Sequence, residues 1–240
     1  LSETLASPEA LEELKALGID LALDFILNHT SVLSKEFQDI LKRGDDSPYR
    51  DFFIDWNRFW DGHGTMTEDG YIQPDAELIR DMFFRKPGLP ILMVRFPDGR
   101  DVPYWNTFYQ EVRYDPIDAQ DLMRVMPLQY GTADVLAQCV NATLARGKTP
   151  KQIDLGRWNA YKAQVADYLE GRRKYLGQMD LNIRSPLVWD YYRDTLKTLV
   201  GYGARVVRLD AFAYAPKEVG ARNFMNDPGT WGLLDKVQEI

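Results

Sequence analysis

The sequence predicts an α/β fold in which parallel strands alternate with helices. Three observations support this prediction. Two largely apolar runs, residues 19–29 and 203–211, have the composition of buried strands. A helical pattern precedes each of them, at residues 7–18 and 185–203. Both strands end in polar or charged side chains. Alternation of this kind implies parallel strands that are joined by right-handed crossovers.

The first helix has clear start and stop signals. Ser7 can cap the first turn, Pro8 suits the first helical position, and Glu9 favours the positive end of the helix dipole. Gly18 indicates the end of the helix. The strand at 19–29 follows directly and is nearly all apolar, so we expect both of its faces to be buried.

A long irregular stretch occupies residues 30–115 and is rich in Trp, Phe, Pro, Gly and Asp. Its segments 51–64 and 85–108 predict short strands and loops that share a small core of their own. Within them, FPDGRD at 96–101 predicts a tight turn between two strands. The stretch therefore separates the first strand from the rest of the α/β pattern.

Helical patterns return in the second half of the chain. Residues 117–176 have helical spacing and mixed charge, which predict two or three helices. An amphipathic helix is predicted at 185–203 and leads into the second strand. We expect this strand to be buried, like the first. The last helix is predicted to begin at Asp227-Pro228.

Composition and charge narrow the classes of function. The 240 residues are 45% hydrophobic, with a formal net charge of −7 and a pI near 5.0. A packed core is feasible, and nucleic acid is not expected as a partner because phosphate binding needs a basic face. Cys139 is the single cysteine, which excludes an intrachain disulfide and fits a reducing compartment. With no apolar run of about 18 residues and no evident signal peptide, we expect a cytoplasmic protein without a membrane partner.

The polar residues that end the two strands form the candidate site. Asp24, Asn28 and His29 lie at the end of the first strand, and Arg208 and Asp210 lie at the end of the second. In a (β/α)8 barrel the working residues lie at the carboxyl ends of the strands, so the two groups would meet in one pocket. Taken alone, however, the arginine and aspartate are better explained as a structural ion pair, and the histidine as a hydrogen-bonded core residue.

Three segments, 24–29 (DFILNH), 178–182 (QMDLN) and 203–211 (GARVVRLDA), resemble recurring motifs of the alpha-amylase family, glycoside hydrolase family 13, in order and spacing. WNRFW, FRKPGLP, WNTF and RLDAFAYAPKE resemble the sucrose phosphorylase branch of that family. Most amylases have Lys-His soon after the nucleophile motif, whereas Ala213-Tyr214 lies in that region here. This departure indicates a protein other than a starch hydrolase.

The resemblance implies part of a (β/α)8 TIM barrel, around its strands 3 and 4, with a long excursion of the domain B type. The barrel segments would be residues 1–29 and 183–240, and the excursion residues 30–182. The resemblance does not extend over about 117–176, which we interpret as an inserted helical segment. The general acid of the family is expected after a later strand, so the rest of the barrel would follow Ile240 and the chain would be a fragment.

The resemblance also implies roles for the residues at the strand ends. Asp210 would be the nucleophile that forms a glucosyl-enzyme ester, and Arg208 would hold that carboxylate ionised and oriented. His29 would hydrogen-bond the glucose in subsite −1. Asp24 and Asn28 would support the end of the strand structurally.

Three further residues are assigned by the same resemblance. Tyr214 and Phe108 would contact the sugar near the scissile bond, although aromatic residues are core residues by default. Lys86 lies where relatives carry a basic residue, and it would meet phosphate or the acceptor; by default it is a solvated lysine.

The activity that the resemblance implies is retaining transfer of a glucosyl group from sucrose, or a related α-glucoside, to inorganic phosphate. The mechanism uses two carboxyl groups about 5–5.5 Å apart. No cofactor and no metal are expected. The alternatives are a retaining α-glucoside hydrolase or transglucosidase, and a catalytically incomplete fragment that only binds sugar. With no complete catalytic pair, the isolated chain is expected to have negligible turnover.

Overall fold

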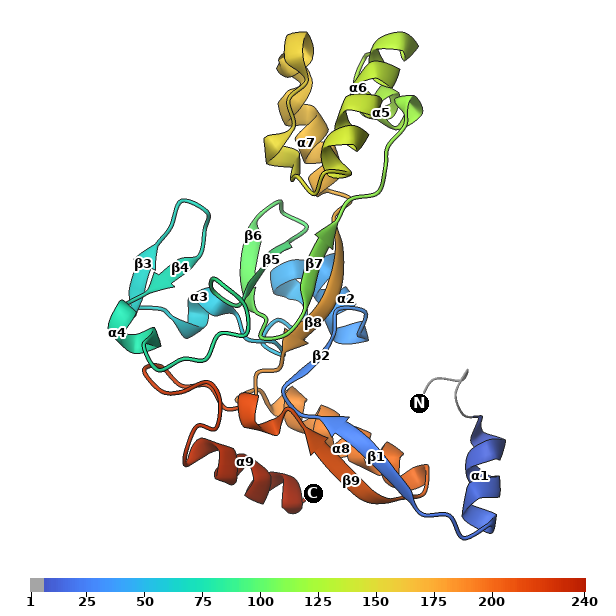
Figure 1. The fold of residues 1–240 in the computed structure, drawn as a ribbon, viewed down its shortest axis with the longest axis vertical. Coiled ribbons are helices and arrows are strands. Elements are labelled where there is room, and N and C mark those ends of the chain that lie inside the picture. The colour runs from blue at the N-terminus through green and yellow to red at the C-terminus, as the bar shows by residue number, and fades with distance from the viewer. Residues whose placement is uncertain (1–6) are drawn as a thin grey trace. The chain divides into compact units, whose positions relative to one another are not determined.

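The computed structural model describes residues 7–240, which divide into two compact units. One unit combines the chain up to Tyr109 with Gly177–Ile240, and the other is Gln110–Leu176. The first unit holds both predicted parallel strands, and the second holds the helices predicted at 117–176 (Figure 1).

The two predicted strands pair in parallel. β1 (Leu21–Ile26) lies beside β9 (Ala204–Asp210), with Asp24 opposite Arg208 and Ile26 opposite Asp210. α8 (Pro186–Gly201) precedes β9 and packs on both strands. The helix, the strand order and the parallel pairing are confirmed.

The predicted helix at the start of the described residues is also confirmed. α1 (Pro8–Ala16) is capped by the Ser7 hydroxyl, which accepts a hydrogen bond from the backbone N–H of Ala10 at 3.2 Å. The chain leaves the helix through Gly18, whose φ of 71° lies in the left-handed region.

The prediction that the two strands are buried on both faces is wrong for the described chain. In β1 only Phe25 is buried, where its ring packs on Tyr192 of α8 at a centroid distance of 5.4 Å. In β9 no residue is fully buried, and Val206 is 58% exposed. The reason is that the sheet has two strands, so each has an unpaired edge, and α8 can cover only one face.

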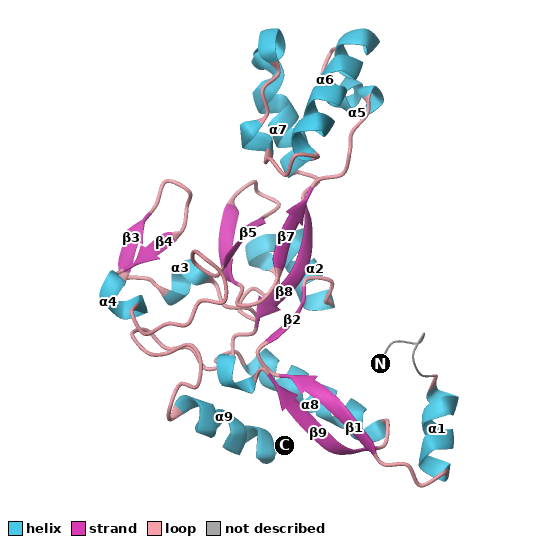
Figure 2. Ribbon diagram, in the orientation of Figure 1, coloured by secondary structure: helices cyan, strands magenta, loops and turns pink. Residues whose placement is uncertain are grey.

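The irregular stretch of the first unit forms short strands and loops, as predicted, and also short helices that were not predicted, such as the one within 51–64 (Figure 2). A hydrophobic cluster of its own lies among them, as predicted. The elements of the stretch are β2 (His29–Ser31), α2 (Lys35–Arg43), η1 (Gly44–Asp46), α3 (Trp56–Phe59), β3 (Gly64–Met66), β4 (Ile72–Pro74), α4 (Ala76–Ile79), β5 (Ile91–Arg95) and β6 (Asp101–Trp105). A cluster of Trp56, Trp60 and Trp105 with aliphatic neighbours fills this core. The tight turn at 96–101 joins β5 to β6, and Phe96 donates its N–H to the carbonyl of Arg100 at 2.8 Å.

The second unit contains the predicted helices and a hydrophobic core of its own. Its elements are β7 (Gln110–Arg113), α5 (Ala119–Val125), α6 (Tyr130–Leu144), η2 (Pro150–Gln152), η3 (Gly156–Tyr161) and α7 (Lys162–Glu170). A capping box between Asp118 and Asp121 begins α5. The helices are confirmed; that they are an insertion in a domain B-type excursion stays a prediction.

The chain returns to the first unit through β8 (Lys174–Asp180), whose end pairs antiparallel with β2 so that Asp180 lies opposite His29. After β9 come η4 (Phe212–Tyr214) and α9 (Gly229–Gln238), the latter near the predicted start at Asp227-Pro228. Searched over residues 7–240, none of these helices has the length and apolar character that a membrane crossing needs.

Candidate active site

The ends of β1 and β9 are tied together by a bidentate ion pair. The Nε and Nη2 atoms of Arg208 each donate to one carboxylate oxygen of Asp24, both at 2.6 Å. The two residues are register partners on neighbouring parallel strands, which brings their side chains together. Hydrogen bonding to Asp24 raises the pKa of the Arg208 guanidinium, and the charge of Asp210 adds a smaller contribution. The direct partner of Arg208 is therefore Asp24, and Asp210 acts on it through its charge.

Asp210 is the last residue of β9 and is exposed. One of its carboxylate oxygens accepts a hydrogen bond from the backbone N–H of Ala211 at 2.9 Å. Ala211 has a φ of 53°, in the left-handed region that a residue with a Cβ seldom adopts. A strained turn of this kind directly after a carboxylate at a strand end is a feature that clusters at functional sites.

His29 follows β1 and is buried. Burial lowers the pKa of its imidazole, the charges of Asp180 and Asp210 act to raise it, and those of Lys217 and Arg85 act to lower it. Asp210 is joined to the same strand end by its backbone carbonyl, which accepts a hydrogen bond from the N–H of Leu27, two residues before His29, at 3.1 Å.

Three of the predicted sugar-contacting residues lie together. The ring of His29 packs on that of Phe108 at 4.5 Å between centroids, and Phe108 meets Tyr214 edge-on at 5.2 Å. Tyr214 packs in turn on Phe224 at 4.6 Å. The three rings come from the β1–β2 junction, the turn after β6 and η4, so distant segments converge here.

The two basic residues before the Pro-Gly-Leu-Pro segment lie over neighbouring rings. The Nζ of Lys86 is 5.6 Å from the ring centroid of Tyr109, and the guanidinium carbon of Arg85 is 4.7 Å from that of Phe108. Sequence reasoning selected Lys86 and missed Arg85. The one sequence feature that could have indicated Arg85 is its position next to Lys86 in the FRKPGLP motif. The sequence does not tell which ring each of these two basic side chains contacts.

Asp180 and Lys217 are the residues that sequence reasoning missed most clearly. They form an ion pair of 2.8 Å with side chains only 1% and 2% exposed, and both contact Asn28. Both lie within segments that resembled the family, QMDLN and RLDAFAYAPKE, but neither lies at the end of a predicted parallel strand. A pairing that spans 37 residues of sequence has no local pattern that could reveal it.

Of the hollows that border this cluster, two lie beside residues of the candidate site. One, of about 410 Å³, has Asp24, His29 and Tyr109 in its lining, together with Phe25, Ile26, Thr30, Ser31, Gly177, Gln178, Tyr191 and Thr195. Asp24 and His29, both from the end of the first strand, line this hollow, whereas Arg208 and Asp210 are outside its lining. The hollow therefore does not confirm the expectation that the two strand ends meet in one pocket.

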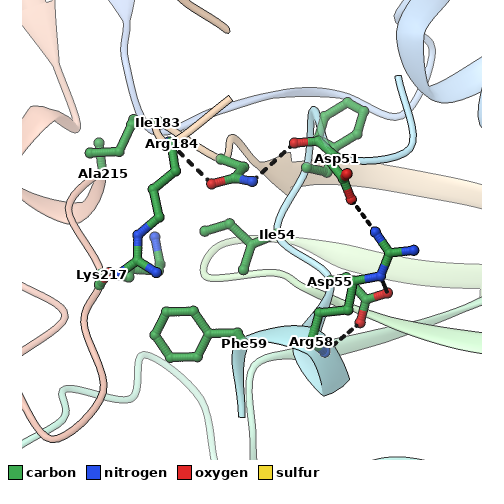
Figure 3. Close-up of a pocket in the computed structure, with 11 residues that line it drawn as sticks. Asp51, Ile54, Asp55, Arg58, Phe59, Ile183, Arg184, Ala215 and Lys217 are labelled. Carbon is green, nitrogen blue, oxygen red and sulfur yellow. Dashed lines mark hydrogen bonds and ion pairs between the residues drawn. The ribbon is translucent and has the colours of Figure 1, made fainter. Parts of the chain in front are cut away.

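The other hollow, of about 250 Å³, borders Lys217 on the side of α3 (Figure 3). Arg184 and Lys217 lie along one side of it, and Arg58 lies opposite with its partners Asp51 and Asp55. Arg58 is already paired with these carboxylates, whereas Arg184 donates to the backbone carbonyl of Lys217 at 3.3 Å. Over residues 7–240, no group of three or more His, Cys, Asp or Glu side chains is arranged to hold a metal ion.

Comparison with curated proteins gives clear relatives, although no protein-family model matches the chain. The chain is 45% identical over 240 residues to a sucrose 6(F)-phosphate phosphorylase of Ilumatobacter coccineus, covering all of this chain and 36% of that protein. It is 26% identical over 231 residues to a sucrose phosphorylase of Streptococcus mutans, covering 95% of this chain and 32% of that protein. The chain thus spans about a third of the length of these relatives.

Comparison with solved structures shows the fold. The structure of sucrose 6F-phosphate phosphorylase from Thermoanaerobacter thermosaccharolyticum matches 97% of this chain and 33% of that chain, with a TM-score of 0.59 at 24% identity. A trehalose-6-phosphate hydrolase of Bacillus licheniformis matches 97% of this chain and 28% of that chain, with a TM-score of 0.50 at 16% identity. The motifs and the relatives agree, and the chain belongs to the sucrose phosphorylase-like branch of glycoside hydrolase family 13.

Proposed function

We propose that this chain is part of a retaining glycoside phosphorylase that transfers a glucosyl group from sucrose, or a sucrose-like α-glucoside, to inorganic phosphate. The observation that carries the proposal is the position of Asp210 at the carboxyl end of a parallel strand, where its backbone carbonyl accepts a hydrogen bond from the N–H of Leu27, two residues before His29. The names of the relatives support phosphorolysis, and one of them is a sucrose 6(F)-phosphate phosphorylase.

Asp210 acts as the nucleophile in this proposal. Its carboxylate attacks the anomeric carbon while a general acid gives a proton to the departing glycosidic oxygen. A phosphate oxygen then attacks the same carbon and releases the carboxylate, which gives α-glucose 1-phosphate. Positive charge that develops on the sugar ring in each step is stabilised by the neighbouring anion. The ion pair of Asp24 and Arg208 fixes the strand ends from which the nucleophile projects.

The sugar is held by the ring cluster in this proposal. His29 is neutral near pH 7 because burial lowers its pKa, so one ring nitrogen can donate to a sugar hydroxyl. Phe108 and Tyr214 offer apolar ring surface to the C–H groups of the glucose. Arg85 places a positive charge over Phe108, and Lys86 places one over the adjacent Tyr109, which suits phosphate as the second substrate.

We further propose that the chain is a fragment of this enzyme, with barrel segments 1–29 and 183–240 and an excursion at 30–182. The support is that it spans about a third of its relatives and that side chains of β9 such as Val206 are exposed. The rest of the barrel, following Ile240, would cover these strands and would supply the general acid.

The test is product analysis of the complete protein with sucrose and with sucrose 6F-phosphate, each with and without phosphate. We expect α-glucose 1-phosphate that depends on phosphate, and at least a 10³-fold loss of kcat in Asp210→Asn. Asp20→Asn is the matched control, because Asp20 lies just before the opposite end of β1, where it pairs with exposed Arg205 at 3.5 Å. Release of free glucose at an unchanged rate without phosphate would favour a hydrolase, and near-normal activity of Asp210→Asn would refute its role. Sugar binding by the Leu1–Ile240 chain without turnover in the complete protein would favour a binding fragment.

A further inference from the structure

A buried ion pair lies beneath the three candidate sugar-contacting rings. Asp180, at the end of β8, and Lys217, after η4, approach to 2.8 Å with side chains that are 1% and 2% exposed. Neither reaches the exposed Asp210, so neither is placed to react. Their hydrogen bonds, however, run to each of the segments that carry a ring.

The carboxylate of Asp180 accepts from two segments besides Lys217. Its Oδ1 accepts from the backbone N–H of Thr107 at 2.8 Å, and its Oδ2 accepts from the Thr107 hydroxyl at 2.6 Å. The same Oδ2 accepts from the side-chain amide of Asn28 at 3.1 Å. Thr107 and Asn28 each directly precede a ring residue, Phe108 and His29.

The ammonium group of Lys217 uses all three of its donors. They go to the carboxylate of Asp180, to the side-chain oxygen of Asn28 at 2.9 Å and to the backbone carbonyl of Tyr214 at 2.6 Å. Because an ammonium only donates and a carboxylate only accepts, the two ions also fix which end of the Asn28 amide faces each of them. The amide nitrogen then also points toward the His29 Nδ1, at 3.5 Å.

We propose that Asp180 and Lys217 form a positioning pair that sets the spacing of the His29, Phe108 and Tyr214 rings for the donor glucosyl group. The inference rests on the proposed glucosyl transfer. A hydrogen bond from the pair reaches each ring residue or the residue directly before it. The ring centroids of His29 and Phe108 are 4.5 Å apart, and those of Phe108 and Tyr214 are 5.2 Å apart. Backbone hydrogen bonds also join the His29 and Phe108 segments to β8, whereas Lys217 links the carbonyl of Tyr214 to Asn28 and Asp180. Ring contacts alone are not directional enough to hold one arrangement.

Stability alone does not explain such a pair. Taking two ions out of water is costly, and replacing a buried ion pair by neutral residues of similar volume is often neutral or stabilising. A pair kept only for stability would therefore be replaceable, whereas a pair that positions the rings is needed for substrate even where the fold tolerates its loss.

The test is the double variant Asp180→Asn/Lys217→Met in the complete protein, in which both charges are removed together so that no unpaired ion is buried. We expect Tm within a few degrees of wild type, a raised KM for the glucosyl donor, and kcat/KM lower by about 10²-fold, the order expected from misplacing substrate by about 1 Å. The matched control is Glu170→Gln/Arg173→Met, which neutralises a largely buried pair of 2.5 Å in the second unit. Its kcat/KM should stay at the wild-type value. A double variant with native Tm and wild-type kcat/KM would overturn the proposal.

A milder variant keeps the test informative if the double variant does not fold. Thr107→Val removes the hydroxyl that contacts Asp180 but keeps the shape of the side chain, and it should raise the donor KM several-fold with little change in Tm. An unchanged KM in Thr107→Val would contradict the proposal.

The ring geometry gives a readout that does not depend on activity. In NMR spectra of the wild-type protein, we expect ring-to-ring contacts between His29 and Phe108 and between Phe108 and Tyr214. The double variant should lose at least one of them. If wild type shows no phosphorolysis but the variant loses these contacts, then the proposed function fails while the positioning stands; unchanged contacts in a folded variant would refute the positioning itself.

Discussion

Arg50 offers a direct test of how the irregular stretch at residues 30–115 is stabilised. Its guanidinium donates to Asp55 at 2.5 Å, to Asp45 at 2.9 Å and to the Tyr104 hydroxyl at 2.7 Å. It also lies between the rings of Phe96 and Tyr104, at 5.1 and 5.4 Å from their centroids. Burial opposes the charge of Arg50, yet Tyr104, Asp45 and Asp55 together raise the pKa of its guanidinium. Arg50→Met keeps much of the apolar stem and removes the charge.

The size of the effect follows from the exposure of the partners. The Asp55 side chain is 6% exposed, so removal of Arg50 leaves a buried carboxylate with only Arg58 at 3.8 Å as a cationic partner. Breaking a buried ion pair from one side costs about 3–5 kcal/mol. Asp45 is 48% exposed and can be hydrated, so it adds little. We expect the free energy of unfolding to fall by about 3 kcal/mol. This is the lower end of that range, because Arg58 remains as a cation near Asp55.

The assay is urea unfolding followed by the fluorescence of the tryptophan cluster, with Tm as a second measure. For a chain of this size, a loss of about 3 kcal/mol lowers Tm by about 6–12 °C. Arg58→Met is the matched control, because that arginine is 56% exposed and pairs mainly with the exposed Asp51, so it should cost less than about 1 kcal/mol. Equal losses in the two variants would refute the argument that burial of Asp55 sets the cost.

Two further predictions concern His29 and Gly64. Burial places the pKa of His29 below its value in the unfolded chain, so the unfolded state binds more protons as pH falls below about 6.5 and stability falls with it. His29→Gln should lose this part of the pH dependence of Tm, and identical Tm–pH curves for the two proteins would contradict the assignment. In Gly64→Ala, the new Cβ would lie 2.2 Å from the backbone oxygen of Gln73 across the β3–β4 pair, so we expect a loss of about 1–3 kcal/mol in urea unfolding. Gly62→Ala, at a position with open space but a φ of 74°, is the comparison for backbone strain, and an equal loss there would show that the clash is not the cause.

Much of the fold could be predicted because its signals are local. The Ser7 cap, the apolar runs of β1 and β9 and the FPDGRD turn each specify an element within a few residues of sequence. Parallel pairing then follows from the order of helix and strand. The burial of the strands could not be predicted in the same way, because burial depends on which other strands and helices are present, and β1 and β9 have only each other and α8.

In the candidate site, too, local motifs could be recognised from the sequence, whereas contacts between distant segments could not. His29, Phe108 and Tyr214 could be selected from motifs and the rings do meet, whereas the roles assigned to them and to Asp210 stay predictions. The partner of Arg208 was expected two residues away, at Asp210, but side chains at i and i+2 of a strand lie on the same face about 7 Å apart. A register partner on the next strand lies closer, and for Arg208 that partner is Asp24.

The contacts divide the site into two parts that differ in what holds them. Asp24, Arg208 and Asp210 lie on exposed strands and are fixed by one exposed ion pair, whose strength depends on solvent and salt. The rings rest instead on Asp180 and Lys217, which are shielded from water within the described chain and hold hydrogen bonds that salt cannot screen well. Salt should therefore loosen the strand ends before it disturbs the rings. Under the proposed function, the rings that would hold the sugar are joined by contacts within this chain. We then expect the proposed nucleophile, Asp210, to gain a fixed orientation only when the proposed further strands cover β1 and β9.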